Sequence, residues 1–365
     1  MKKALFVLLS AIIVGSMLLI GCGGAPQEEQ GKVYEFTSSL YLPSAHLFTG
    51  LQDSWGKEIE KRSAGRVKIT FYPAGQLVKA PDTPDAIQKG IADIAFAHID
   101  YNRGRFPVTE ALDLPMGYPT GWVGSHVATD FFNKYKPKEW DGFHVLLFNA
   151  GTTAGLMTHD KKITNLEDLK GVTLRGAGMV ADAINALGAT ARDISMAEMY
   201  DSVSKGVVDG ALVGIETLKS FKMGDVCKYT AFAWQPGSMY TFYLAMNKDK
   251  WNSLPKDLQK IFNEVSAEWA EKYAECWNQI DIDGINYSLG KGNEVYKLSD
   301  SEGKRFKDAV QPVLGKYTDA MVAKGYSKSE VEGWLNYIKS RIEYWTPKEK
   351  ERGIPSPFDL SLPQG

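Results

Sequence analysis

The chain of 365 residues lacks the motifs on which most enzymes and metal proteins depend. Its five histidines show no metal-binding spacing such as H-E-x-x-H. It contains no G-x-S-x-G nucleophile elbow and no G-x-x-x-x-G-K-[ST] phosphate loop. Asp281, Asp283 and Gly284 are spaced like part of a calcium loop, but the acid that should close such a loop is missing. A catalytic pair of carboxylates remains an open alternative, because the sequence contains many Asp and Glu residues. The sequence therefore predicts no identifiable enzyme site, no metal and no cofactor.

The chain also contains little cysteine and no large excess of positive or negative charge. The chain has 42 Lys and Arg against 44 Asp and Glu, and no basic cluster of the kind that binds nucleic acid. The three cysteines are Cys22, Cys227 and Cys276. Cys276 continues the apolar stripe of an expected helix, so a buried free thiol is a more economical interpretation than a disulfide.

The start of the chain has the features of an export signal. Lys2 and Lys3 precede an apolar run over residues 4–20, which ends in Leu-Ile-Gly-Cys at residues 19–22. This ending is similar to a bacterial lipobox, with cleavage before Cys22 and a lipid on its thiol. We therefore expect a signal peptide over residues 1–21, a lipidated tether over 22–31 and an extracytoplasmic location. A retained membrane anchor, or secretion with a chance cysteine, is the alternative.

Strand-like and helix-like segments alternate through the rest of the chain, which predicts a mainly parallel α/β fold. A helix is indicated by Leu47, Leu51, Trp55 and Ile59, and a short one by residues 82–90, with Asp82 as its N-cap. A long helix is expected from residue 256 to about 280, followed by helices near 302–324 and 328–344 and an extended tail over 353–365. The expected strands are Val33–Ser38, Val67–Tyr72, Ile94–Ala97, Val145–Phe148, Val172–Leu174 and Ala211–Val213.

Arg175 is the main candidate for a binding residue. It ends an expected strand just before a turn and a helix, and its planar guanidinium can hold a carboxylate through two parallel hydrogen bonds. An ion pair with Glu198 or Asp193 is the alternative. The residues after it, Gly176-Ala177-Gly178-Met179-Val180-Ala181, also fit the dinucleotide pattern G-x-G-x-x-A. We expect these glycines to permit a tight turn instead, because a strand-end arginine suits a carboxylate better.

The same stretch resembles the solute-binding proteins of TRAP (tripartite ATP-independent periplasmic) transporters. The shared pattern includes D-L-K-G at residues 168–171, Arg175, A-L-G-A at 186–189, E-x-Y at 198–200 and G-V-V-D-G at 206–210. The resemblance implies two α/β domains with an interdomain cleft and a long hinge-spanning helix, with Arg175 as carboxylate ligand and TRAP membrane subunits as partners. The expected division is 32–152 plus about 243–282 for domain I, and 153–242 plus about 283–365 for domain II.

Further residues are expected at the cleft because most of them follow strands whose ends open on such a crevice. For each one, packing or a surface hydrogen bond is at least as good an interpretation. These ligand-binding candidates are Tyr41, His46, His98, Tyr101, Thr152, Thr153, Met179, Glu216, Trp234, Tyr240 and Phe242.

Two departures from the family pattern bear on the ligand. Ala211-Leu212-Val213-Gly214 stands where many members have Gln-Glu-Asn, and Thr153-Ala154-Gly155-Leu156 stands where many have a second arginine. The loss of polar partners at both places favours a monocarboxylate with an apolar or aromatic body over sialic acid or a small dicarboxylate. Two other functions remain open: a binding lipoprotein of an ABC importer or sensor kinase, and an exported α/β enzyme.

Overall fold

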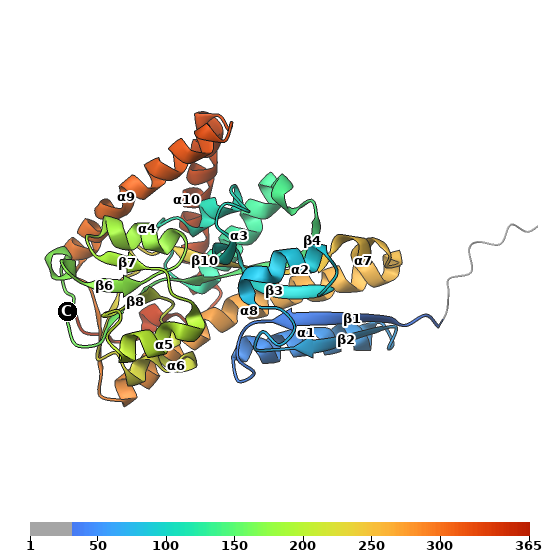
Figure 1. Ribbon diagram of the computed structural model, residues 1–365, viewed down its shortest axis with the longest axis horizontal. Helices are drawn as coiled ribbons and strands as arrows, with labels where there is room; N and C mark the ends of the chain where they lie inside the picture. The colour runs from blue at the N-terminus through green and yellow to red at the C-terminus, as the bar shows by residue number, and fades with distance from the viewer. Residues whose placement is uncertain (1–30) are drawn as a thin grey trace, which may run out of the picture.

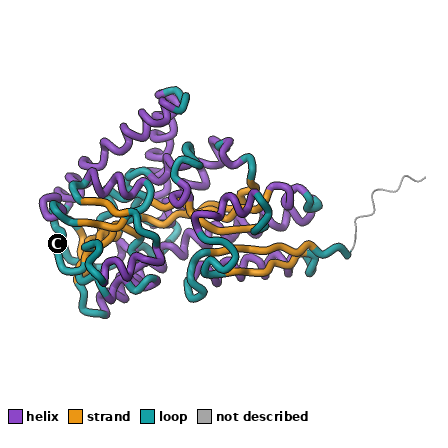
Figure 2. Tube along the Cα trace, viewed as in Figure 1, coloured by secondary structure: helices purple, strands orange, loops and turns teal. Residues whose placement is uncertain are grey.

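The computed structural model describes residues 31–365, so the expected signal peptide and Cys22 lie outside the described residues. The molecule is elongated, with two β-sheets surrounded by helices, and the first described residues and the C-terminus lie at opposite ends (Figures 1 and 2). Within residues 31–365, none of the helices combines the length and apolar character needed to cross a bilayer.

The first sheet has five strands in the order β2-β1-β3-β10-β4. β1 is parallel to β2 and β3, whereas β10 lies between β3 and β4 and is antiparallel to both. All nine residues of β10 are buried, so this strand occupies the middle of the fold. The strands are β1 (Tyr34–Leu40), β2 (Val67–Tyr72), β3 (Ile94–His98), β4 (Phe143–Thr152) and β10 (Met239–Asn247). The helices near this sheet are α1 (Leu47–Arg62), α2 (Thr83–Gln88), α3 (Gly121–Tyr135) and α7 (Lys248–Asn252).

The second sheet has six short strands in the order β11-β9-β5-β8-β6-β7. β5 is antiparallel to both of its neighbours, and the other pairs are parallel. The strands are β5 (Gly155–Thr158), β6 (Thr173–Arg175), β7 (Thr190–Arg192), β8 (Gly210–Val213), β9 (Tyr229–Phe232) and β11 (Glu294–Lys297). The helices α4 (Met179–Ala186), α5 (Met196–Ser204) and α6 (Thr217–Ser220) connect them.

Two crossings run directly from a strand of one sheet to a strand of the other, from β4 to β5 and from β9 to β10, and helix α8 (Lys256–Gly290) leads back from the first sheet to the second. The two crossings are hydrogen-bonded to each other, because Thr153 N donates to Ser238 O and Ser238 N donates to the Thr153 hydroxyl, both at 3.0 Å. Helix α8 has 35 residues and contacts α1, α3 and β4 near the first sheet and α6 and β11 near the second. The expected domain boundaries near 152 and 243 fall close to these crossings and stay a prediction.

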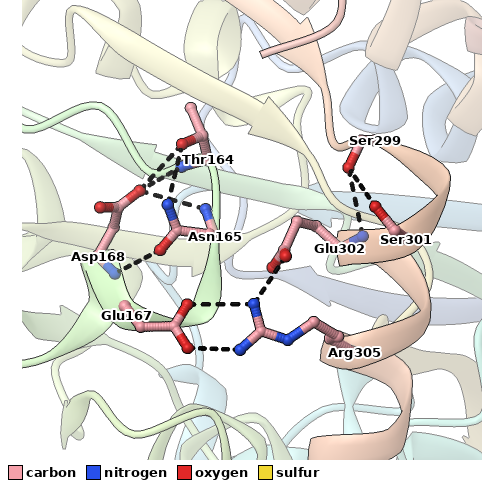
Figure 3. A network of polar contacts seen from close by, with 8 residues as sticks. All are labelled: Thr164, Asn165, Glu167, Asp168, Ser299, Ser301, Glu302 and Arg305. Atoms are coloured by element: carbon pink, nitrogen blue, oxygen red, sulfur yellow. Dashed lines mark hydrogen bonds and ion pairs between the residues drawn. The ribbon is translucent and has the colours of Figure 1, made fainter.

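The last two helices return across the molecule. Helix α9 (Asp300–Ala323) contacts α4, whereas α10 (Lys328–Glu351) contacts α3 beside the first sheet. Figure 3 shows how α9 is attached at its start: Arg305 pairs with both Glu302 of α9 and Glu167 of the 3-10 turn Leu166–Leu169. That turn is itself closed by a capping box between Asn165 and Asp168. The C-terminal helices therefore contact helices that belong to both halves of the molecule.

The structure confirms the expected helices and strands with shifts of a few residues. The α8 helix runs ten residues beyond the expected end, and the strands β5, β7, β9, β10 and β11 were not expected. The apolar side of α1 differs in detail, because Leu47 is 52% exposed and Phe48 is buried in its place. Asp82 occupies the N-cap position of α2 without a capping hydrogen bond from its side chain.

Candidate functional site

A narrow cavity of about 30 Å³ lies between the two sheets. It is lined by the loop after β1, the ends of β3, β4, β6 and β8, the start of β10, the α5 and α6 segments, and α8. Eight of the candidates predicted from the sequence line it: Tyr41, His46, His98, Thr152, Arg175, Glu216, Tyr240 and Phe242. The other lining residues are Leu42, Gly151, Met196, Val213, Gly214, Phe221 and Trp277, which were not predicted.

Arg175 is fully buried at the carboxyl end of β6, yet no acidic side chain pairs with it in the described chain. Its Nε donates to the backbone oxygen of Ile194 at 2.8 Å and its Nη1 donates to the Tyr240 hydroxyl at 3.2 Å. Its Nη2 has no partner. Neither Glu198 nor Asp193 forms the alternative ion pair; the Glu198 carboxylate accepts from Ser195 instead. A buried cation with an unused donor faces the cavity, which is an arrangement suited to an anion.

Aromatic rings form a continuous wall beside Arg175. The His98 ring lies 5.1 Å from that of Tyr240 and 5.2 Å from that of Phe242, and Phe242 lies 5.0 Å from Trp277. Burial, together with the charge of Arg175, lowers the pKa of His98 to about 3, so this ring is neutral at physiological pH. Its Nδ1 atom is buried without a hydrogen-bond partner. The wall is thus mainly apolar, and the His98 ring and the Tyr240 hydroxyl add uncharged polar atoms to it.

His46 and Glu216 bring further polar groups to the cavity. His46 is the N-cap of α1, since its Nδ1 accepts from the Phe48 N–H at 3.2 Å, and burial lowers its pKa to about 4. Burial raises the pKa of Glu216 to about 7, although the hydroxyl of Ser220 donates a hydrogen bond to its carboxylate. Among the described residues, Arg175 is the one arginine or lysine that lines the cavity.

The remaining predicted residues do not line the cavity. Tyr101 packs its ring against Tyr41 and His98, at centroid distances of 5.5 and 4.0 Å. Thr153 forms part of the crossing, and Met179 is buried in the core at the start of α4. Trp234 lies in a groove on another part of the surface, where its ring contacts that of Phe358.

The glycine-rich turn before α4 does not have room for a dinucleotide phosphate. Gly178 has a φ of +55°, and a Cβ atom added there would lie 2.4 Å from the carboxyl carbon of Asp100. A buried carboxyl group therefore occupies the start of α4, where a pyrophosphate would otherwise bind. The same turn brings the two halves together, because Arg103 beside Asp100 pairs with Asp182 of α4. These contacts hold the halves against each other across the cavity.

Neither metal binding nor a disulfide is indicated in the described residues. No group of three His, Cys, Asp or Glu side chains there could hold a metal ion. Cys227 and Cys276 are both free thiols, Cys227 buried and Cys276 only partly so. Asp281 and Asp283 lie on α8, without the loop that a calcium site needs.

Comparison with known proteins gives one consistent family. The model of bacterial extracellular solute-binding protein family 7 matches residues 39–320. A monocarboxylate 2-oxoacid-binding periplasmic protein of Nostoc sp. is 28% identical over 67% of this chain and 68% of its own. The C4-dicarboxylate-binding protein DctB of Bacillus subtilis is 26% identical over 71% of this chain and 75% of its own.

A solved structure shares the fold as well. A TRAP periplasmic solute-binding protein of Bordetella bronchiseptica, with bound (R)- and (S)-mandelate, has a TM-score of 0.75 and 26% identity. The match covers 85% of this chain and 99% of that one. Two sheets joined by crossing strands, a cavity between them and a family match over most of the chain agree with one another. This chain belongs to the family 7 bacterial extracellular solute-binding proteins, the solute-binding proteins of TRAP transporters.

Proposed function

We propose that this protein captures an organic acid with a single carboxylate and an apolar or aromatic body. Arg175 binds the carboxylate, and the rings of the cavity contact the body. The observation that carries this proposal is a fully buried guanidinium with no acidic partner and with Nη2 unused in a ring-lined cavity.

The physical reason is the cost of an uncompensated charge. Burying an isolated cation costs several kcal/mol even after relaxation, and two hydrogen bonds to neutral oxygens offset only part of that cost. A ligand carboxylate supplies the missing counter-charge and accepts from Nη2. In a cavity of low dielectric this pairing is stronger than it would be in water.

The lining favours one carboxylate over two. Within residues 31–365, no lysine or second arginine lines the cavity and burial keeps His46 and His98 neutral, so a second carboxylate would lack a cationic partner. The ligands named for three relatives support a monocarboxylate in part. The Nostoc protein is named for monocarboxylate 2-oxoacids and the Bordetella protein holds mandelate, which agrees with one carboxylate, whereas DctB is named for C4-dicarboxylates. The aromatic wall of His98, Tyr240, Phe242 and Trp277 suits a ring or an alkyl chain.

Binding requires the two halves to separate. A cavity of about 30 Å³ accommodates water but not an aromatic acid, so the ligand enters an open form and the halves close by hinge bending at the crossings and α8. Closure by ligand requires tighter binding to the closed form than to the open one. The loaded protein then delivers the acid to TRAP membrane subunits, while a lipid on Cys22 holds it at the membrane.

A thermal-shift screen of the purified protein against organic acids tests this function. The panel contains aromatic acids, 2-oxo acids, dicarboxylates, sugar acids, amino acids and neutral sugars. A ligand at a hundred times its Kd adds about 2.7 kcal/mol of stability, which is a rise of a few degrees. We expect monocarboxylates to give the largest shifts and Arg175→Ala to abolish them.

The matched control is Arg192→Ala, because Arg192 pairs with Arg175 in register on β7 but is exposed. Tighter binding of succinate or of neutral sugars than of aromatic acids would contradict the proposal. Lipid anchoring has a separate test: Cys22→Ala should move the protein from the membrane fraction to the extracytoplasmic fluid.

A further inference from the structure

Glu216 is a second charged group in the ligand cavity, on the strand next to that of Arg175. β6 and β8 are adjacent and parallel, and Glu216 follows β8 as Arg175 ends β6. The Glu216 side chain is 6% exposed and lines the cavity. No lysine or arginine of the described chain pairs with it. A carboxyl group buried in an aromatic cavity without a cation needs another partner.

The position of Glu216 is fixed from the side away from the cavity. Its backbone N–H donates to Asp281 Oδ1 of α8 at 3.1 Å. Gly284 of the same helix allows this close approach, because a Cβ atom there would lie 2.6 Å from Ile215 O. The hydroxyl of Ser220 donates to Glu216 Oε2, whereas no hydrogen bond within the described residues uses Oε1. One carboxyl oxygen is therefore held in place, and the other remains available for a ligand.

Arg175 and Glu216 occupy separate positions in the lining of the cavity. They form no ion pair with each other, although both are buried and both line it. Burial raises the pKa of the Tyr41 hydroxyl, and the charges of Glu216 and Arg175 act on it in opposite directions, so Tyr41 lies near both side chains. A ligand whose carboxylate binds Arg175 can therefore present a second polar group to Glu216.

We infer that the natural ligand carries a hydroxyl group at the end remote from its carboxylate, and that this hydroxyl binds to Glu216 Oε1. The inference rests on the proposed function, in which Arg175 takes the carboxylate. A hydroxyl is preferred to an ammonium because it can donate to an ionised Glu216 and accept from a protonated one. An ammonium serves only the ionised form, which burial disfavours. The ligand class is thus a hydroxylated monocarboxylate.

Calorimetric titration with four related acids tests this role. The probes are phenylacetate, 3-hydroxyphenylacetate, 4-hydroxyphenylacetate and 4-(aminomethyl)phenylacetate. In the wild-type protein one hydroxylated acid should bind about 10- to 100-fold more tightly than phenylacetate, as expected for a hydrogen bond to a charged group. In Glu216→Leu this advantage should disappear, so that the hydroxylated acids and phenylacetate bind with similar affinities.

Two further variants separate the role of Glu216 from a folding effect. Glu216→Gln keeps the shape and one acceptor oxygen, so it should retain part of the hydroxyl preference. Glu198→Gln alters an exposed carboxylate on α5 and should change none of the four affinities.

The outcomes distinguish this inference from the proposed function. Binding of phenylacetate that survives Arg175→Ala would overturn the proposed function itself. Arg175-dependent binding with no hydroxyl preference, or a preference that persists in Glu216→Leu, would overturn the inference alone. A gain for the aminomethyl acid that depends on Glu216 would also overturn it, in favour of an ammonium ligand. Failure of all four acids to bind would overturn the aromatic class and the inference together.

Discussion

Arg175→Met should remove ligand binding while leaving the stability of the ligand-free protein nearly unchanged. Methionine has a similar length but no charge. The change deletes two hydrogen bonds from a charged donor, to Ile194 O and the Tyr240 hydroxyl. Such bonds contribute about 1.5–3 kcal/mol each, or roughly 3–6 kcal/mol together. It also removes a desolvation penalty of several kcal/mol for the buried cation. The free energy of unfolding should therefore change by no more than about 2 kcal/mol.

The assay is urea unfolding with and without a monocarboxylate at a hundred times its wild-type Kd. The ligand should stabilise the wild-type protein by about 2.7 kcal/mol and the variant by nothing. Arg192→Met, on the exposed neighbouring position of β7, should keep the full ligand effect. Tyr240→Phe removes only one partner of Arg175 and should lower the ligand-free stability by about 1.5–3 kcal/mol.

The opposite pattern would refute the reasoning. If Arg175 were part of a structural ion pair, its removal would leave a buried carboxylate and cost about 3–5 kcal/mol. A loss of that size in the ligand-free protein, with the ligand effect intact, would assign Arg175 to the fold and not to the ligand.

Three other changes probe the closed arrangement and the buried acids. Arg103→Ala removes an exposed pair with Asp182 between the halves, so ligand affinity measured by calorimetry should fall by at most about fivefold, and by less in high salt. Gly178→Ala places a methyl group against the Asp100 carboxyl at a φ of +55° and should cost about 1–3 kcal/mol in thermal unfolding, partly restored by Asp100→Ala. Burial raises the pKa of Glu216 from 4.5 to about 7, so the folded protein binds the carboxyl proton of Glu216 more tightly than the unfolded chain does. The stability that results is fully present below pH 4.5 and is lost as the pH rises to 7. Over that range the wild type should lose up to about 3 kcal/mol more than Glu216→Gln in urea unfolding, and equal slopes would contradict this assignment.

The elements that could be predicted from sequence are those with a local pattern. The stripe from Leu258 to Trp269 predicts α8, and the alternation at Val67–Tyr72 predicts β2. Strands of three or four residues, such as β7 and β11, carry too few residues for a pattern. β10 was missed for a different reason: it is buried on both faces, so its sequence shows a continuous apolar run without alternation.

The candidate site likewise contains some residues that the sequence predicts and others that it does not. Arg175, His98 and Glu216 could be placed because they follow strand ends in a parallel arrangement. Trp277 lines the cavity from the middle of α8, where its position one turn after Tyr273 indicates only a buried side of a helix. Phe221 and Met196 reach the cavity from short segments around α5 and α6. Their role depends on how the two halves meet, which no local pattern records.

The position of β10 has a consequence for the order in which the molecule can fold. β3 and β4 are not paired with each other; β10 lies between them, so β4 reaches the rest of the sheet only through β10. β10 begins at Met239, so it is synthesised only after all of the residues that form β5 to β9. The N-terminal sheet therefore cannot close on a growing chain until most of the polypeptide is available, and contacts so distant in sequence form slowly.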